Sequence, residues 1–215
     1  MPGSYGQFCP VARSLDVLGD RWTLLVLRDL SMGRQRFTDL RANLTGIPPN
    51  VLSQRLKRLV EHGLVTLEEL PPPAARTVYA LTDRGREVIP VLRALVRFGM
   101  PELPKATADL GVRADTVAHA LFLAWFDQRA AERHGIDEHY DLVVADTATY
   151  HLSSARPRLL RRVEGPAAVT LEGPAWALAR LRQGDTLDAL TGDDRLAVTG
   201  TKAARTRFRD VFALA

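Results

Sequence analysis

This chain of 215 residues lacks several features, and each absence excludes a class of protein. The single cysteine cannot form a disulfide within the chain, so a disulfide-stabilised secreted fold is not expected. No apolar run approaches the roughly 20 residues that span a bilayer, because Arg28 and Asp29 interrupt residues 24–27. The first residues do not combine a basic start with an apolar stretch, so no secretory signal is predicted. We therefore expect a cytoplasmic protein.

Motifs of enzyme chemistry are also missing. The sequence contains no Gly-rich phosphate loop, no Gly-x-Ser-x-Gly and no Cys-x-x-Cys. Residues 134–139 hold two histidines and two acids, but the spacing of His134 and His139 does not place them on one helical face. A solvated loop is the favoured interpretation of this segment. The sequence therefore predicts no enzyme, no metal site and no cofactor.

The charge that is present is unevenly distributed. Residues 1–104 carry 14 Lys/Arg and 10 Asp/Glu, whereas residues 105–215 carry 15 of each. All of the net charge of +4 therefore lies in the first part of the chain. Such an asymmetry indicates an anionic partner for that part, although +4 is too small to identify one.

Two domains are predicted, both long enough to bury a core. The clearest break is the run from Gly99 to Pro104, where two prolines and a glycine end one helix before another element begins. We assign residues 1–104 to a first domain and residues 105–215 to a second. The predicted fold class is α+β for the whole chain.

The first domain shows the order of elements of a winged helix-turn-helix. Apolar spacing predicts helices at 11–19, 22–30, 37–44 and 50–62. Two strand-like runs, 64–68 and 77–81, are joined by a loop containing Pro71–Pro73, and a long helix is predicted from residue 82 to residue 98.

The helix predicted at 50–62 carries the chemistry of DNA recognition. Leu52, Leu56 and Leu59 commit one face to the core. Basic side chains can bond guanine, and Asn and Gln can bond adenine, in the major groove. The predicted DNA-binding residues are those of the opposite face, a flanking arginine and an arginine at the hairpin tip: Asn50, Ser53, Gln54, Lys57, Arg58, Arg55 and Arg76. A solvated amphipathic helix without a partner is the alternative.

The first domain contains a series of short motifs in a fixed order, at residues 9–12, 18–23, 28–30, 36–40, 49–53, 56, 64–65 and 78–85. In these motifs it resembles the HxlR-type winged-helix transcriptional regulators. The resemblance implies a homodimer that binds an inverted-repeat DNA operator and dimerises through residues 8–19 and 82–98. One position departs from the family, which usually has a capping serine or threonine where this chain has Pro48. Proline offers no side-chain oxygen to the helix start, so phosphate contacts from that end are in question.

Cys9 draws attention because some HxlR-type regulators sense oxidants or electrophiles with a cysteine at this position. A sensor needs an accessible sulfur that ionises readily. The alternative is a small packing residue near the dimer interface. Nothing in the local sequence forces the thiol to ionise, although Arg13 lies one helical turn away.

The second domain is predicted to contain one helix over 116–133, further helices and a sheet. Over about residues 115–215, and mainly over the last fifty, which include Gly173, Gly200 and Phe212, it resembles the sterol-carrier-protein-like fold. It implies a sheet covered by helices around an apolar cavity. The predicted pocket residues are Trp125, Phe126, Tyr150, Leu152, Trp176, Leu178 and Phe208. Ordinary core packing is the alternative for each of them.

These observations predict a homodimeric DNA-binding transcriptional regulator, acting as a repressor. A small apolar or aromatic effector would bind in the second domain and alter the spacing of the two recognition helices. Two alternatives remain open. The first is a regulator that senses oxidants or electrophiles through Cys9, and the second is a hydrophobic-ligand carrier whose helix-turn-helix does not bind DNA.

Overall fold

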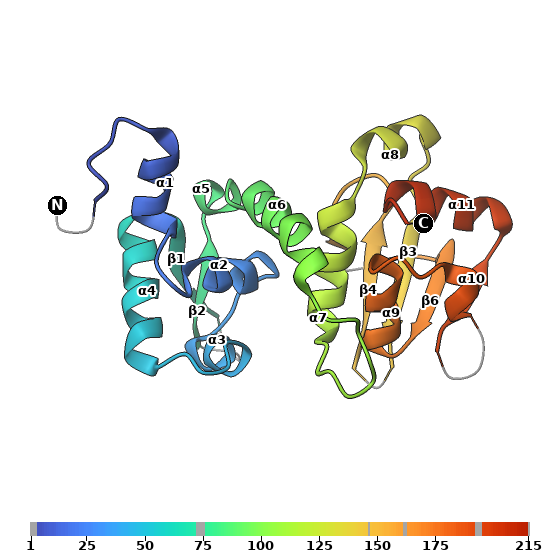
Figure 1. Ribbon diagram of the computed structural model, residues 1–215, viewed down its shortest axis with the longest axis horizontal. Helices are drawn as coiled ribbons and strands as arrows, with labels where there is room; N and C mark the ends of the chain where they lie inside the picture. Colours follow the sequence, from blue (N-terminus) through green and yellow to red (C-terminus); the bar gives the residue numbers. More distant parts are fainter. Residues whose placement is uncertain (1–3, 72–75, 146, 161–162, 192–194, 215) are drawn as a thin grey trace. The chain divides into compact units, whose positions relative to one another are not determined.

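A computed structural model of the chain describes residues 4–71, 76–145, 147–160, 163–191 and 195–214 (Figure 1). The contacts divide the chain into two compact units, Met1–Leu92 (unit 1) and Arg93–Ala215 (unit 2). The division falls inside helix α6 (Ile89–Gly99). None of the helices over the described residues has the length and apolar character needed to traverse a lipid bilayer.

Unit 1 has a winged helix-turn-helix fold, as the sequence predicts. Its elements follow in the predicted order: α1 (Pro10–Leu18), α2 (Thr23–Ser31), α3 (Phe37–Asn43), α4 (Pro49–Glu61), β1 (Val65–Leu70), β2 (Arg76–Leu81) and α5 (Asp83–Arg86). Aliphatic side chains from these elements form one core, in which Val26, Leu27 and Leu40 are completely buried. Apolar positions at helical spacing, together with residues of the hairpin such as Val65 and Leu81, thus produce a single hydrophobic centre.

One element of unit 1 was predicted incorrectly. The sequence predicts a continuous helix over 82–98, but the structure has two, α5 and α6, separated at Glu87 and Val88. Pro90 explains the break, because a proline inside a continuous helix lacks the N–H donor and its ring clashes with the carbonyl four residues earlier. The proline is tolerated where it is, in the first turn of a new helix.

The wing of unit 1 is the antiparallel hairpin of β1 and β2, with Val65 opposite Leu81 and Leu70 opposite Arg76. A third segment joins it. Gln35, in the connection between α2 and α3, exchanges two backbone hydrogen bonds with Tyr79, at 3.0 Å and 2.7 Å. The predicted loop at Pro71–Pro73 lies mostly outside the described residues.

Unit 2 is built on a five-stranded sheet. Its strands are β3 (His139–Val144), β4 (Ala148–Ser153), β5 (Leu159–Leu160), β6 (Val169–Gly173) and β7 (Ala197–Gly200), in the order β5-β4-β3-β6-β7. Only the central pair, β3 and β6, runs parallel. Along β3, Tyr140, Leu142 and Val144 are buried and the residues between them are half-buried. One face of the sheet is therefore apolar and the other polar.

Helices supply the second layer of unit 2. They are η1 (Met100–Glu102), α7 (Ala114–Thr116), η2 (Val117–Phe122), η3 (Leu123–Trp125), α8 (Gln128–His134), α9 (Ala175–Arg182), α10 (Leu187–Leu190) and α11 (Lys202–Val211). The prediction of one helix over 116–133 is wrong, because the helical path ends at Trp125 and restarts at Gln128. Asp127 causes the restart, since its carboxylate accepts the backbone N–H groups of Arg129 and Ala130 and caps α8.

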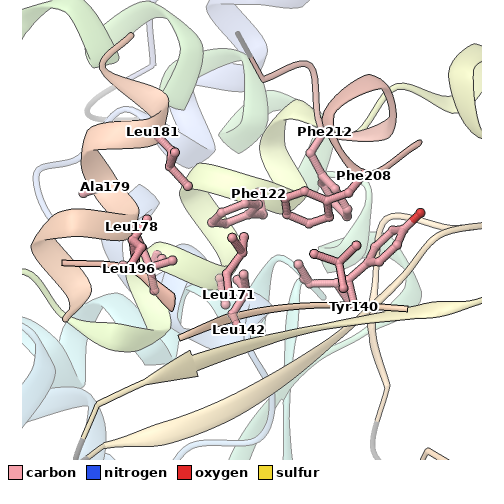
Figure 2. Close-up of a cluster of buried hydrophobic side chains, with 14 of the residues drawn as sticks. Phe122, Tyr140, Leu142, Leu171, Leu178, Ala179, Leu181, Leu196, Phe208 and Phe212 are labelled. Atoms are coloured by element: carbon pink, nitrogen blue, oxygen red, sulfur yellow. The ribbon is translucent and has the colours of Figure 1, made fainter. Parts of the chain in front are cut away.

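Aromatic rings fill the core of unit 2 between the sheet and the helices. Figure 2 shows Phe122, Phe208 and Phe212 side by side above the strand residues. The ring centroids of Phe208 lie 5.9 Å, 5.0 Å and 5.1 Å from those of Phe122, Tyr140 and Phe212. The hydroxyl of Tyr140 points away from the cluster (Figure 2) and donates to Glu138 Oε1 at 2.8 Å. The rings therefore pack together, and the one polar atom among them has a partner.

Candidate nucleic-acid interface

Helix α4 presents one apolar and one polar face. Leu52, Leu56 and Leu59 are no more than 1 % exposed and belong to the core of unit 1. Four of the seven predicted DNA-binding residues lie on the exposed side of the helix: Asn50, Ser53, Gln54 and Lys57. Lys57 is 77 % exposed, and its 3.9 Å contact with Glu61 is too solvated to hold it. These four side chains are free to contact a partner.

Arg55 and Arg58 make contacts within unit 1 instead. Both guanidinium groups pair with the carboxylate of Asp20, which lies between α1 and α2; the Arg55 contact measures 3.1 Å. Arg55 also donates to the carbonyl of Arg21 at 3.2 Å, and Arg58 to the carbonyl of Asp16 at 3.3 Å. The Arg55 side chain is only 15 % exposed. These two arginines hold α4 against the preceding helices.

The start of α4 forms without a capping side chain. Pro48 is the N-cap residue and makes no side-chain hydrogen bond, and Pro49 occupies the first turn. Two prolines fix the backbone in the angles that the helix entry requires, so the helix forms despite the missing cap. The carbonyl of Pro48 accepts the first helical hydrogen bond from Leu52 at 3.0 Å.

The wing carries the last predicted DNA-binding residue. Arg76 opens β2 and is exposed. Further down the hairpin, Arg34 pairs with Glu68, and the Thr77 hydroxyl donates to Glu69 at 2.7 Å. Those acids are occupied within unit 1, and neither they nor another described acid forms an ion pair with Arg76.

One exposed cation was missed by the sequence reasoning. Arg41 lies on α3, the helix before α4, and is exposed. Over the described ranges it takes part in no ion pair, unlike Arg36, the N-cap residue of the same helix, which pairs with Asp39. A signal was available in the sequence, because Arg41 is a basic residue on the short helix predicted just before the helix at 50–62.

Cys9 is the N-cap residue of α1 and is half-buried. It lines an open surface depression of about 560 Å³ together with Phe8, Pro10 and Arg13. The guanidinium of Arg13 pairs with Asp16 at 3.1 Å.

The seven predicted pocket residues all belong to unit 2, where they form part of its core or pack against it. Leu152, Leu178 and Phe208 are completely buried in the core. The other four are half-buried and pack against that core: Trp125, Phe126, Tyr150 and Trp176. A surface depression of about 480 Å³ lies elsewhere on unit 2, between α10, β7 and α11, and none of the seven lines it.

Trp125 and the neighbouring Arg182 each have a buried donor. The Arg182 guanidinium lies 4.9 Å from the Trp125 ring centroid, and Arg97 lies 5.6 Å from it. Trp125 Nε1 and Arg182 Nε are both buried and have no hydrogen-bond partner among the described residues. Burial lowers the pKa of Arg182 to about 10, which leaves it charged at neutral pH.

Comparison with known proteins shows which family the first part of the chain resembles. Residues 17–107 match the family described as "HxlR-like helix-turn-helix". The chain is 36 % identical over 104 residues to the HTH-type transcriptional regulator sll1512 of Synechocystis, a match that covers 48 % of this chain and 77 % of that relative. It is 37 % identical over 87 residues to the HTH-type transcriptional regulator YvaP of Bacillus subtilis, covering 40 % of this chain and 81 % of YvaP.

A mycobacterial relative and a solved structure extend the comparison. The HTH-type transcriptional regulator Rv3095 of Mycobacterium tuberculosis is 41 % identical over 95 residues, which cover 44 % of this chain and 60 % of that relative. The reduced form of the transcriptional regulator YodB from B. subtilis is 28 % identical, with a TM-score of 0.39, and the match covers 43 % of this chain and 92 % of YodB.

Proposed function

The chain belongs to the HxlR-like helix-turn-helix family of DNA-binding transcriptional regulators, and we propose that it acts in the cytoplasm as a homodimeric repressor controlled by a small effector. The recognition surface that we propose consists of the exposed face of α4 and the wing. Unit 2 is proposed to be the sterol-carrier-like effector domain. Its five-stranded sheet with one helix-covered apolar face supports this assignment.

The main support for the proposed DNA-binding surface is the exposed polar face of α4. Asn50 and Gln54 have the amides that pair with adenine, and Lys57 has the ammonium that bonds guanine or phosphate. Asp20 fixes the helix through Arg55 and Arg58, so this face is presented in one orientation. We propose that Arg55 and Arg58 contribute positive potential and positioning, while Arg76 and Arg41 contact phosphates.

Exposed apolar residues support the homodimer. Val11 and Leu15 on α1 are 67 % and 43 % exposed, and Phe8 just before them is fully exposed. Val91, Leu95 and Phe98 form a second exposed stripe, along α6. Isolated exposed apolar side chains are ordinary, but a stripe at helical spacing indicates a surface that is covered by a partner. A two-fold dimer would place two α4 helices in successive major grooves, about 34 Å apart.

Sequence selection from a random duplex library tests the DNA surface, followed by fluorescence anisotropy on the enriched sequence. Lys57→Ala is expected to weaken binding roughly tenfold. If Lys57 contacts phosphate, the slope of log K against log salt flattens by about 0.9; if it contacts guanine, discrimination at one position falls by about 1–3 kcal/mol. Asn50→Ala and Gln54→Ala are expected to relax sequence preference. Arg133→Ala, at an exposed position on α8, is the matched control and leaves binding unchanged.

Two outcomes contradict this proposal. One is that no sequence is enriched. The other is that the variants on α4 bind the enriched sequence as tightly as the wild type. Either result favours the hydrophobic-ligand carrier, which native mass spectrometry of the purified protein would detect as a retained lipid or other apolar molecule.

The dimer is tested by light scattering after gel filtration. Phe98→Glu, which places a charge in the stripe on α6, is expected to shift the wild-type dimer to monomer. Ile136→Glu changes an apolar residue that is 44 % exposed outside α1 and α6, and it is expected to leave the dimer intact. A monomeric wild-type protein, or a dimeric Phe98→Glu variant, contradicts the proposed interface.

The effector proposal rests on the half-buried aromatic residues and on the two buried donors, Trp125 Nε1 and Arg182 Nε. Burying a donor without a partner costs about 1–3 kcal/mol, so an acceptor supplied by a ligand would relieve that cost. An aromatic or apolar molecule carrying one acceptor group fits this chemistry.

A thermal-shift screen of aromatic carboxylates and ketones tests the effector. Trp125→Phe keeps a ring but removes the indole donor, and it is expected to abolish the shift of any compound that binds beside Trp125. Trp22→Phe, in unit 1, is the matched control. A shift that survives Trp125→Phe places the effector elsewhere.

A further inference from the structure

A cluster of two histidines and an aspartate lies on the polar face of the unit 2 sheet. His139 and Asp141 are two residues apart on β3, so both lie on the side opposite the buried Tyr140 and Leu142. His151 on β4 is directly opposite Asp141 in the antiparallel register. The strand pairing therefore brings together three side chains that are separated by up to 12 positions in the sequence.

The distances within the cluster are short. His151 Nδ1 lies 2.7 Å from Asp141 Oδ1, and His139 Nε2 lies 3.8 Å from the same oxygen. One ligand atom from each residue lies within 4.8 Å of the other two. The side chains are 11 %, 19 % and 28 % exposed for His139, Asp141 and His151, so the group is largely withdrawn from water but still reachable.

A purely structural role of this cluster does not explain the position of His139 Nε2. It is buried and has no hydrogen-bond partner among the residues that the structure describes. A hydrogen bond between His151 and Asp141 would suffice to stabilise the hairpin of β3 and β4. That bond gives no reason for a second, unpaired imidazole nitrogen to face the same carboxylate, and a buried polar atom without a partner requires an explanation.

We propose that His139, Asp141 and His151 bind a divalent transition-metal ion, with Zn²⁺ as the best-fitting member of that class. Two imidazole nitrogens and one carboxylate oxygen are a ligand set suited to Zn²⁺ and related ions. Ligand atoms about 2.05 Å from a tetrahedral ion are about 3.3 Å apart. The two observed separations lie on either side of that value, so each changes by about 0.5 Å when the ion enters. Water completes the coordination.

The three residues are none of those proposed for the DNA surface or for the effector. Sequence inspection missed it because it considered His139 only with His134, which ends α8 and contacts Asp210 at 3.0 Å. The relevant partner of His139 is on the next strand, and only the register of β3 and β4 identifies it.

Zinc binding by the full-length protein tests the proposal. The protein is stripped with chelator, titrated with ZnCl₂ by calorimetry, and assayed for bound metal after dialysis. We expect one equivalent bound by the wild type and a loss of affinity of about 100-fold in His139→Ala and His151→Ala. The matched control is His134→Ala, which removes a histidine that also contacts an aspartate, and it keeps the full equivalent.

The Asp141→Asn variant tests whether a loss of Zn²⁺ binding is caused by misfolding. It preserves the size of the side chain and can still hydrogen-bond His151, and it is expected to weaken Zn²⁺ binding at least tenfold with an unchanged circular dichroism spectrum. Co²⁺ gives a second readout, because tetrahedral coordination produces visible absorption bands that these variants should lose. Absence of binding to the wild type, or equal binding by wild type, His139→Ala and His151→Ala, overturns the proposal.

Discussion

The core of unit 1 is formed by aliphatic side chains, whereas four aromatic rings occupy the centre of the unit 2 core. The two units also differ in the groups that their arginines contact. In unit 1, Arg55 and Arg58 bind one carboxylate at the base of α4. In unit 2, Arg182 donates to the carbonyls of Phe212 and Ala213, and Arg207 forms two hydrogen bonds to Glu138.

This difference shows that the number of basic residues in a unit does not by itself identify a surface for an anionic partner. Unit 2 contains many arginines, but those just named satisfy its own carbonyls and carboxylates. Unit 1 uses two arginines to fix a helix and leaves the polar face of that helix unoccupied. The proposed surface for an anionic partner therefore rests on the exposed side chains of α4 and not on the number of basic residues.

The largest effect is expected from removing a ring of the unit 2 core. Phe208→Ala should lower the free energy of unfolding of unit 2 by about 3–5 kcal/mol, because Phe208 is fully buried and contacts three other rings. Chemical denaturation followed by near-ultraviolet circular dichroism measures this loss. Phe126→Ala, at a half-buried position beside the same core, should cost less. A loss below about 1 kcal/mol for Phe208→Ala would show that the rings are not packed as described.

A smaller effect, dependent on pH, is expected at Glu138. Burial opposes ionisation of this carboxyl, but hydrogen bonds from Arg207 and Tyr140 outweigh it and lower the pKa of Glu138. A lowered folded-state pKa stabilises the fold above the unfolded pKa, and the contribution is lost as the pH falls through the folded value. Glu138→Gln should therefore cost about 1.5–3 kcal/mol at pH 7, and the difference from wild type should shrink below about pH 4.

Urea denaturation at a series of pH values measures this difference. The control is Glu132→Gln, which changes an exposed carboxylate on α8 that accepts a hydrogen bond from Gln128. A stability difference that stays constant from pH 7 to about pH 3 would contradict the assigned ionic contact.

Loss of the carboxylate that holds α4 should have a modest effect on stability. Asp20→Ala removes both arginine contacts, and since Asp20 is 35 % exposed we expect a loss of about 1 kcal/mol at low salt and less at high salt. Asp83→Ala, which removes a fully exposed partner of Arg86, should have no measurable effect. Equal stabilities of the Asp20→Ala and Asp83→Ala variants would show that Asp20 does not hold the helix.

The smallest effect is expected at Cys9, where Cys9→Ser should leave stability and DNA affinity unchanged. The side chain is half-buried beside an open depression, so an oxidant can reach it. If Cys9 is the sensor, oxidant treatment lowers the DNA affinity of the wild type but not of Cys9→Ser. A response that persists in Cys9→Ser rules out the sensor alternative.

Unit 1 could be predicted from the sequence almost element by element, because its helices and strands have clear apolar periodicity. The error at Pro90 came from extending a favourable pattern through a residue that cannot occupy a helix interior. In unit 2, the prediction of one helix over 116–133 was wrong at Asp127. The predicted pattern was again extended through a residue that does not continue a helix, because Asp127 caps the start of α8. The two-residue strand β5 was too short to give a pattern.

The sites were predictable only where one element carries them. The polar residues of α4 share a helix, so periodicity placed them on one face. The internal contacts of Arg55 and Arg58 were not predictable, because Asp20 lies more than thirty residues away in the sequence. The cluster of His139, Asp141 and His151 likewise depends on strand register, which is a property of the assembled sheet.

The pairing of Gln35 with Tyr79 has a mechanical consequence for unit 1. Two backbone hydrogen bonds join the segment before α3 to the centre of the second wing strand, so the wing is attached at a point other than its own hairpin. Movement of β2 is therefore coupled directly to the entry of α3. In the DNA complex proposed above, a phosphate contact on the wing would also position the helix-turn-helix through this link.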